Sequence, residues 1–379
     1  MSGSLFGLRE VTLPASGGRQ SPDDTAVAAT KHNQGVNTPR SPGARLNSIT
    51  LEIPCGATAV VGLSGAGKTS LLNVLAGFET GFSGELILAS RSGQPPDDLF
   101  TKGLQGTNQG TDVPRAPKNL PLYWVPQSGG LWPHLSVEQH VAIVGNLANP
   151  QSSIESGRFS KSTDEILQLF DLTHRRQALP GELSQGERSR LALARALATR
   201  ASVLLLDEPL SHVDPVRKPT YWNIVRRIIA EENISMVFTS HEPETVLRHA
   251  EHVICLHEGA VAFEGSVRSL YDHPPDARVG AFLGPLNWFR AEEAAAFLAS
   301  DWQIAESVGL RPERLQIQPS SESLIEILST PFIGAYGESI VRHVVSGMTK
   351  TILHQVPESA ASIGQRVALR IHPRPGATR

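Results

Sequence analysis

A chain of 379 residues with 40% hydrophobic and 19% charged residues is long enough for two globular domains. Its formal net charge of −3 at pH 7 lacks the basic excess typical of DNA- or RNA-binding proteins, so we expect no nucleic-acid partner. Two cysteines, Cys55 and Cys255, fit a reducing compartment, and the sequence contains neither a signal peptide nor an apolar run long enough to span a membrane. We therefore expect a cytoplasmic protein whose membrane role, if it has one, runs through a partner.

The first part of the chain predicts short strands separated by two insertions. Residues 5–13 and 49–53 alternate apolar and polar side chains, and residues 59–61 form an apolar run, so we expect three strands. Residues from about 14 to 47 and from about 90 to 120 are rich in Pro, Gly, Ser, Asp and Asn. Such segments cannot bury a core, and we interpret them as long loops.

The segment GLSGAGKT, Gly62–Thr69, is the strongest functional signal in the sequence. It follows the apolar run, precedes apolar residues at helical spacing over 71–75, and fits the pattern G-x-x-x-x-G-K-[ST]. In such a loop, backbone N–H groups and a helix N-terminus surround phosphate, Lys68 reaches the β- and γ-phosphates, and the Thr69 hydroxyl ligates Mg²⁺. We predict nucleoside triphosphate binding by Gly62, Leu63, Ser64, Gly65, Ala66, Gly67, Lys68, Thr69 and Ser70.

The middle of the chain alternates strands and helices. A short strand ends at Gln127, and a helical pattern covers 136–170. A strong helix is predicted over 184–199, because a serine begins it, a glutamate stands three positions after that serine, and apolar residues form one stripe. The continuous apolar run 203–206 indicates a strand buried on both faces. Further helices and strands alternate up to residue 263, which predicts a layered α/β domain with a largely parallel sheet.

Two carboxylates follow the buried strand. Asp207 is suited to hold Mg²⁺, usually through water, and Glu208 to polarise an attacking water. Asp-Glu-Pro is also good turn chemistry, but the four apolar residues before it favour a strand end beside the phosphate loop.

The sequence changes character after Pro285. A short helix is predicted over 291–299, and alternating segments separated by Gly and Pro then indicate the strands of a small β-barrel. We therefore expect an α/β domain over 1–287 and a small all-β domain over 288–379.

Taken together, these motifs resemble the ATP-binding subunit of an ATP-binding cassette (ABC) transporter, and the resemblance covers residues 5–287. It implies a P-loop ABC ATPase domain with a helical subdomain at about 128–200. The motifs stand in family order: GLSGAGKT, VPQSGG with Gln127, the signature LSQGE (Leu183–Glu187), LLLDEP, SHVD (Ser211–Asp214) and FTSHEPE with His241.

The resemblance implies a homodimer that closes head to tail around ATP. Ser184 and Gly186 of one copy then contact the γ-phosphate bound by the other, helped by the N-terminus of the helix that Ser184 begins. Asp214 is implied at the dimer interface. Closure with ATP and reopening after hydrolysis would drive a separate partner.

The resemblance also assigns the catalytic residues. Gln127 contacts Mg²⁺ and the attacking water and senses the helical subdomain, and His241 holds the γ-phosphate and orients Glu208 and the water. The implied cofactors are ATP and Mg²⁺, with Thr69, Gln127 and Asp207 around the metal.

Three positions depart from the family pattern. Gln185 replaces a glycine of the signature, Glu187 replaces its closing glutamine, and Glu242 follows the histidine where aspartate is common. In addition, residues 14–20 offer no aromatic side chain to stack on adenine, so base stacking is unassigned.

The C-terminal part resembles the accessory OB-like (TOBE) domain of importer ATPases that serve sugars, polyamines, sulfate, molybdate or ferric iron. The resemblance rests on GLRPE at 309–313 and on VALRIHP at 367–373. It implies transmembrane permease subunits as partners, a solute-binding protein as an indirect one, and a peripheral position on the inner face of the cell membrane. The alternative is a soluble ABC ATPase acting on nucleic acid or ribosomes, which usually has two cassettes or a coiled coil; this chain has one phosphate loop and no sustained heptads.

Overall fold

The computed structural model describes residues 4–14, 45–88, 122–147, 161–199, 201–298, 306–331, 333–356 and 362–372. The chain divides into two compact units, Met1–His241 with Arg248–Glu264, and Glu242–Leu247 with Gly265–Arg379. Most of the first expected insertion and all of the second lie outside the described residues. One difference at their edge is that β2 begins at Leu46, inside the segment predicted as a loop.

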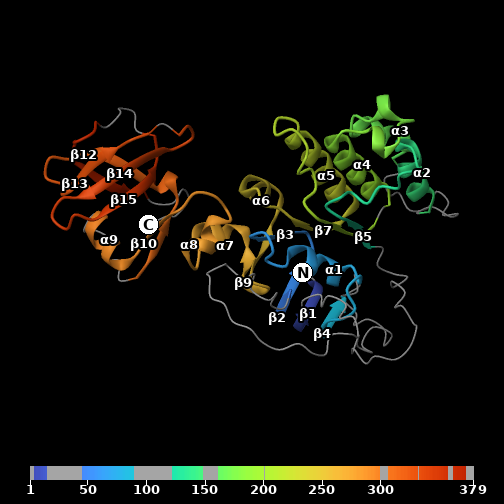
Figure 1. The fold of residues 1–379 in the computed structure, drawn as a ribbon, viewed down its shortest axis with the longest axis horizontal. Coiled ribbons are helices and arrows are strands. Elements are labelled where there is room, and N and C mark those ends of the chain that lie inside the picture. The colour runs from blue at the N-terminus through green and yellow to red at the C-terminus, as the bar shows by residue number, and fades with distance from the viewer. Residues whose placement is uncertain are drawn as a thin grey trace, which may run out of the picture. The chain divides into compact units, whose positions relative to one another are not determined.

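A largely parallel sheet forms the centre of the first unit (Figure 1). Within the described ranges it holds six strands, and every adjacent pair from β5 to β8 runs parallel. All four residues of β6 are buried, as expected for a strand covered on both faces. In spatial order the strands are β5 (Leu122–Val125), β6 (Val203–Leu206), β7 (Ser235–Thr239), β3 (Ala57–Gly62), β8 (His252–His257) and β9 (Ala260–Ser266).

A second, antiparallel sheet shares an apolar cluster with the helix that follows the phosphate loop. Its order is β2 (Leu46–Pro54), β1 (Ser4–Leu13) and β4 (Ser83–Leu88). Helix α1 (Lys68–Leu75) buries Leu71, Leu72, Val74 and Leu75 in one apolar cluster shared with both sheets. This burial holds the start of α1 in a fixed position at the end of β3.

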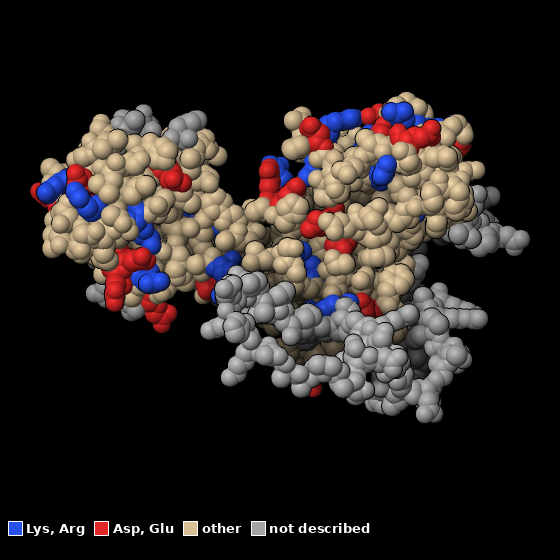
Figure 2. All heavy atoms as spheres, viewed as in Figure 1, with Lys and Arg blue, Asp and Glu red and all other residues tan. Residues whose placement is uncertain are grey.

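Four helices lie together at one end of the first unit (Figure 1): α2 (Val137–Leu147), α3 (Thr163–Leu169), α4 (Gln185–Ala198) and α5 (Lys218–Glu232). Helix α4 is buried from Arg190 to Ala198 and packs against α2, α3 and α5. On the face drawn in Figure 2, acidic and basic side chains are intermixed over this helical part. Helix α6 (Pro243–His249) follows β7.

The second unit is rich in β-structure, as predicted. Its strands form small antiparallel pairs and a three-stranded sheet around one apolar core. Helix α9 ends at Phe297, before the predicted residue 299, and Leu298 forms a bridge to Leu369 instead. The elements are α7 (Val267–Asp272), α8 (Ala277–Ala281), β10 (Asn287–Phe289), α9 (Ala291–Phe297), β11 (Val308–Leu310), β12 (Leu315–Pro319), β13 (Ile325–Ser329), β14 (Gly337–His343), β15 (Thr349–His354) and β16 (Val367–Ile371).

Among the residues described, no helix has the length and apolar character needed to cross a membrane.

Candidate nucleotide-binding site

The phosphate loop joins β3 to α1, and its tip is exposed at Leu63, Ser64 and Gly65. Gly67 precedes the helix with φ 102°, and a Cβ there would lie 2.6 Å from the carbonyl oxygen of Arg45, so only glycine fits. No acidic residue lies in the first turn of α1. The backbone N–H groups and the positive end of this helix are therefore available to an anion.

Lys68 lies over the loop that it follows. Its Nζ donates to the carbonyl oxygens of Gly62 at 2.8 Å and Leu63 at 3.1 Å. The ammonium group is thus held beside the backbone amides on which a phosphate would bind.

Asp207 connects the phosphate-loop helix to the central sheet. Its carboxylate, in a residue only 4% exposed, accepts a hydrogen bond from Thr69 Oγ1 to Oδ2 at 2.8 Å and another from Thr239 Oγ1 to Oδ1 at 2.7 Å. Thr239 Oγ1 also accepts the backbone N–H of Glu208 at 2.8 Å. Both carboxylate oxygens are therefore paired, as a buried charge requires.

Glu208 contacts the two other side chains that were predicted to be catalytic. Gln127 Nε2 donates to Glu208 Oε2 at 3.1 Å, and His241 Nδ1 lies 3.5 Å from Glu208 Oε1. The three residues follow β5, β6 and β7, which are neighbours in the sheet, so the carboxyl ends of three parallel strands converge here. Glu208 has φ 48°, a left-handed conformation that costs a non-glycine residue energy and is concentrated at functional sites.

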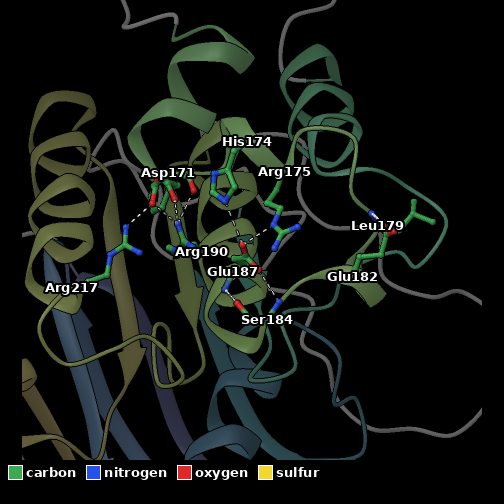
Figure 3. A network of polar contacts seen from close by, with 10 residues as sticks. Asp171, His174, Arg175, Leu179, Glu182, Ser184, Glu187, Arg190 and Arg217 are labelled. Atoms are coloured by element: carbon green, nitrogen blue, oxygen red, sulfur yellow. Dashed lines mark hydrogen bonds and ion pairs between the residues drawn. The ribbon is translucent and has the colours of Figure 1, made fainter.

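The signature segment, residues 183–187, forms the N-terminus of α4. Ser184 is its N-cap, with Oγ accepting from Glu187 N at 3.2 Å and the Ser184 N–H donating to Glu187 Oε2 at 2.8 Å (Figure 3). These hydrogen bonds of Ser184 therefore stay within the signature rather than reaching the phosphate loop. Gly186 faces the backbone of His212, and Asp214 Oδ1 accepts the N–H of Val216 just before α5.

Two basic side chains surround Glu187 (Figure 3). Arg175 Nε donates to Glu187 Oε1 at 3.1 Å, and His174 Nε2 lies 3.7 Å from the same oxygen. Burial would raise the pKa of Glu187, but hydrogen bonds from Ser184 and Arg175 together with the charge of Arg175 outweigh it and lower the pKa to about 2. The signature thus carries a carboxylate that stays ionised.

The structure brings together Thr69, Asp207, Glu208, Gln127 and His241, all predicted from sequence. It also adds Thr239, which the sequence analysis missed. Thr239 ends the buried strand β7, two positions before His241, and a hydroxyl directly after three apolar residues was the available signal.

A phosphate loop at the start of a helix, carboxylates at the end of strand β6 of the same sheet and a capped signature helix define a nucleotide-binding domain of the ABC type. The model of the family described as ABC transporter matches residues 46–211. The Fe(3+) ions import ATP-binding protein FbpC 2 of Pectobacterium atrosepticum is 31% identical over 342 residues, which cover 83% of this chain and 89% of that protein. The sulfate/thiosulfate import ATP-binding protein CysA of Burkholderia pseudomallei is 32% identical over 80% of this chain and 81% of its own length.

The spermidine/putrescine import ATP-binding protein PotA of Ruegeria pomeroyi is 33% identical over 62% of this chain and 58% of its own length. The solved cassette MJ0796, in a dimeric post-hydrolysis state bound to ADP and Pi, has the same fold, with a TM-score of 0.50 and 22% identity over 69% of this chain and 99% of that one. The chain belongs to the ABC transporter family and is an ATP-hydrolysing subunit of that family. This confirms the family predicted from the motifs.

Replacing Thr239 by valine tests the hydroxyl that joins Asp207 to Glu208. We expect Thr239→Val to lower the free energy of unfolding by about 1–3 kcal/mol and to reduce ATP hydrolysis, because Asp207 Oδ1 and the Glu208 N–H lose a partner. The matched control is Thr58→Val on the adjacent strand β3, since Thr58 Oγ1 is buried without a hydrogen-bond partner and its loss should cost nothing. Urea unfolding of both variants is the measurement, and equal stabilities would contradict the assignment.

The ion pairs of Glu187 predict a pH-dependent stability. The pKa of Glu187 is about 2 in the folded chain, below its ordinary value of 4.5, so its contribution is complete above about pH 4.5 and is lost as the pH falls toward 2. We expect Glu187→Gln, which can still cap α4, to be less stable than the wild type at pH 7, by a margin that shrinks between pH 4.5 and 3.

Urea titrations at several pH values measure this margin. Glu182→Gln is the control, because Glu182 caps the preceding turn by accepting the Leu179 N–H. A margin for Glu187→Gln that is independent of pH would show that the charge of Glu187 contributes nothing.

Proposed function

We propose that this chain is the ATP-hydrolysing subunit of a solute importer, and that two copies close head to tail around ATP. The observation that carries the hydrolytic part is the convergence of Gln127, Glu208 and His241 beside the Thr69–Asp207 pair. The import part is supported by relatives named as import ATP-binding proteins and by the β-rich C-terminal unit.

The phosphate loop, Gly62–Ser70, binds the triphosphate in this proposal. Two observations support that role: the tip of the loop is exposed, and no acidic side chain in the first turn of α1 offsets the positive end of that helix. Lys68 exchanges its contacts with loop carbonyls for oxygens of the β- and γ-phosphates.

Thr69, Asp207 and Gln127 are the residues that would hold Mg²⁺. Their hydroxyl, carboxylate and amide oxygens are the ligand types that this cation prefers, and Gln127 keeps its amide oxygen available because Nε2 is the atom that binds Glu208. When bound, Mg²⁺ offsets the negative charge of the phosphates.

Glu208 acts as the base in hydrolysis. It accepts a proton from a water molecule whose oxygen bonds to the γ-phosphorus as the bond to the ADP oxygen breaks. Gln127 contacts one oxygen of the Glu208 carboxylate and His241 the other, so the two residues orient it. His241 also stabilises the charge developing on the γ-phosphate.

The second copy supplies the other half of the site. Ser184 Oγ accepts from Glu187 N, and in the proposed dimer its hydroxyl proton turns from the Glu187 carboxylate to the partner's γ-phosphate. The Gly186 N–H and the N-terminus of the 14-residue helix α4 assist, and Asp214 lies at the interface. Gln185 adds a side chain close to the same phosphate.

We further propose that residues 1–287 form the ATP-binding domain, with its helical subdomain at about 128–200, and residues 288–379 the OB-like (TOBE) domain. Permease subunits dock on the ATP-binding domain at the inner face of the cell membrane, and a solute-binding protein delivers the cargo. The relatives carry the names of ferric iron, sulfate or thiosulfate, and spermidine or putrescine importers, so their names assign no single cargo.

Glu208→Gln tests the base. We expect this variant to bind ATP but to lose at least about a hundredfold in hydrolysis, because the amide cannot accept the proton from water. In ATP it should accumulate as a closed dimer on size-exclusion chromatography. Glu231→Gln, on the exposed side of α5, is the matched control; normal turnover by Glu208→Gln would make the assignment of Glu208 wrong.

Lys68→Ala tests the phosphate loop separately. Removing the ammonium group should abolish ATP binding or hydrolysis, measured with a fluorescent ATP analogue and by phosphate release. Retained hydrolysis would contradict the role of the loop.

Reconstitution with its permease subunits tests import. We expect one solute, among ferric iron, oxyanions, polyamines and sugars, to stimulate ATP hydrolysis in proteoliposomes. If the permease leaves the rate of ATP hydrolysis unchanged and nucleic acid or ribosomes increase it, the importer proposal is wrong.

A further inference from the structure

We propose that Arg195 is a positioning residue that fixes the Gln127 loop, residues 126–135, to helix α4, so that the contact between Gln127 and Glu208 depends on the position of α4. This inference rests on the proposed roles of Gln127 and Glu208 and on the link between Gln127 and the helical subdomain that the family resemblance implies. It adds the residue that makes this link, eight positions beyond the signature on the same helix.

The Arg195 side chain makes a two-point attachment to the loop. Its two terminal nitrogens donate to successive carbonyl oxygens, Nη1 to Gly130 and Nη2 to Gly129, both at 2.8 Å. Arg195 is only 2% exposed, so water does not compete for these bonds. Because the guanidinium is planar, two such bonds fix the orientation of the loop as well as its distance from α4.

The loop backbone is shaped for this contact. Gly129 and Gly130 have φ 79° and 58°, two consecutive left-handed residues that turn both carbonyls toward α4. A Cβ at Gly130 would lie 3.0 Å from Pro126 Cγ, so a side chain there would strain the loop.

Aromatic rings hold the guanidinium on its other sides. Trp132 lies 4.8 Å from Arg195 Cζ and Tyr123 5.8 Å, measured to the ring centroids. The backbone N–H of Trp132 donates to Nε2 of His140, a fully buried residue of α2, and the two rings stack with their centroids 5.6 Å apart. The loop is therefore fastened to α4 and α2 together.

Only Ser128 separates Gln127 from the fastened glycines. Gln127 donates to Glu208 at the end of β6, while Ser184 and Gly186 begin the helix that holds the loop. From Gln185 to Arg195 the helix extends about 15 Å, so the signature and the attachment move as one body. A cavity of about 260 Å³, lined by Gln127, Arg188, Glu208 and others, gives Gln127 room to leave Glu208 when α4 shifts.

A double-mutant cycle between Arg195→Lys and Gln127→Ala tests this inference. Lysine keeps the charge but cannot bind both carbonyls in one plane, so we expect kcat for ATP hydrolysis to fall at least about tenfold with a smaller change in KM. In the Gln127→Ala background the same change should alter kcat by less than about twofold, because the contact it disturbs is already absent.

Arg190→Lys is the matched control. Arg190 lies on the same helix, is buried, donates from Nη1 to the carbonyls of Phe170 at 2.6 Å and Asp171 at 2.9 Å, and lies over the ring of Tyr221. Its contacts lead away from the Gln127 loop. Any loss of kcat in Arg190→Lys should therefore be the same factor with and without Gln127.

Three results would overturn the inference, and they separate it from the proposed function. If Gln127→Ala hydrolyses ATP at the wild-type rate, the proposed role of Gln127 is wrong and the inference falls with it. If Gln127→Ala is impaired but Arg195→Lys leaves kcat unchanged, or lowers it by one factor in both backgrounds, only the inference is wrong. Should Arg195→Lys not fold, Trp132→Leu, which removes the half-exposed ring over the guanidinium, replaces it in the same cycle.

Discussion

The site depends on a buried carboxylate that is satisfied from two directions. Asp207 ends β6, and its oxygens accept hydroxyl hydrogen bonds from Thr69 at the start of α1 and from Thr239 at the end of β7. A buried charge without these partners would be costly, so the phosphate-loop helix and two sheet strands must meet at this point. The position of the phosphate loop relative to Asp207 and Glu208 therefore follows from the need to pair the buried carboxylate of Asp207.

The parallel sheet places the remaining groups. Because β5, β6 and β7 are neighbours, Gln127, Glu208 and His241 reach one point although 81 residues separate the first two. Chain topology rather than local sequence brings them together. The left-handed backbone at Glu208 and the hydroxyl of Thr239 at its N–H then fix how this carboxylate leaves the strand.

Local patterns were predictable from the sequence, and long-range pairings were not. The phosphate loop and the Ser184–Glu187 cap each lie within a few residues, where periodicity and spacing are informative. The order of the family motifs identified Gln127 and His241, but the spacing of these residues in the sequence does not show that both contact Glu208. Thr239 and Arg195 were missed because each acts on backbone or side chains 31 to 66 residues away, through a sheet order and a helix packing that the pattern does not encode.

The departure at Glu187 has a physical account. A negative charge in the first turn stabilises α4 through the helix dipole, yet it stands where the proposed dimer brings a phosphate. Arg175 and His174 approach its outer oxygen, while its other oxygen caps the Ser184 N–H. The carboxylate is thus largely offset by its own neighbours, which reduces its repulsion of a phosphate at this helix end in the proposed dimer. An acidic residue at this position is therefore compatible with an anion-binding helix end, provided that Arg175 accompanies it.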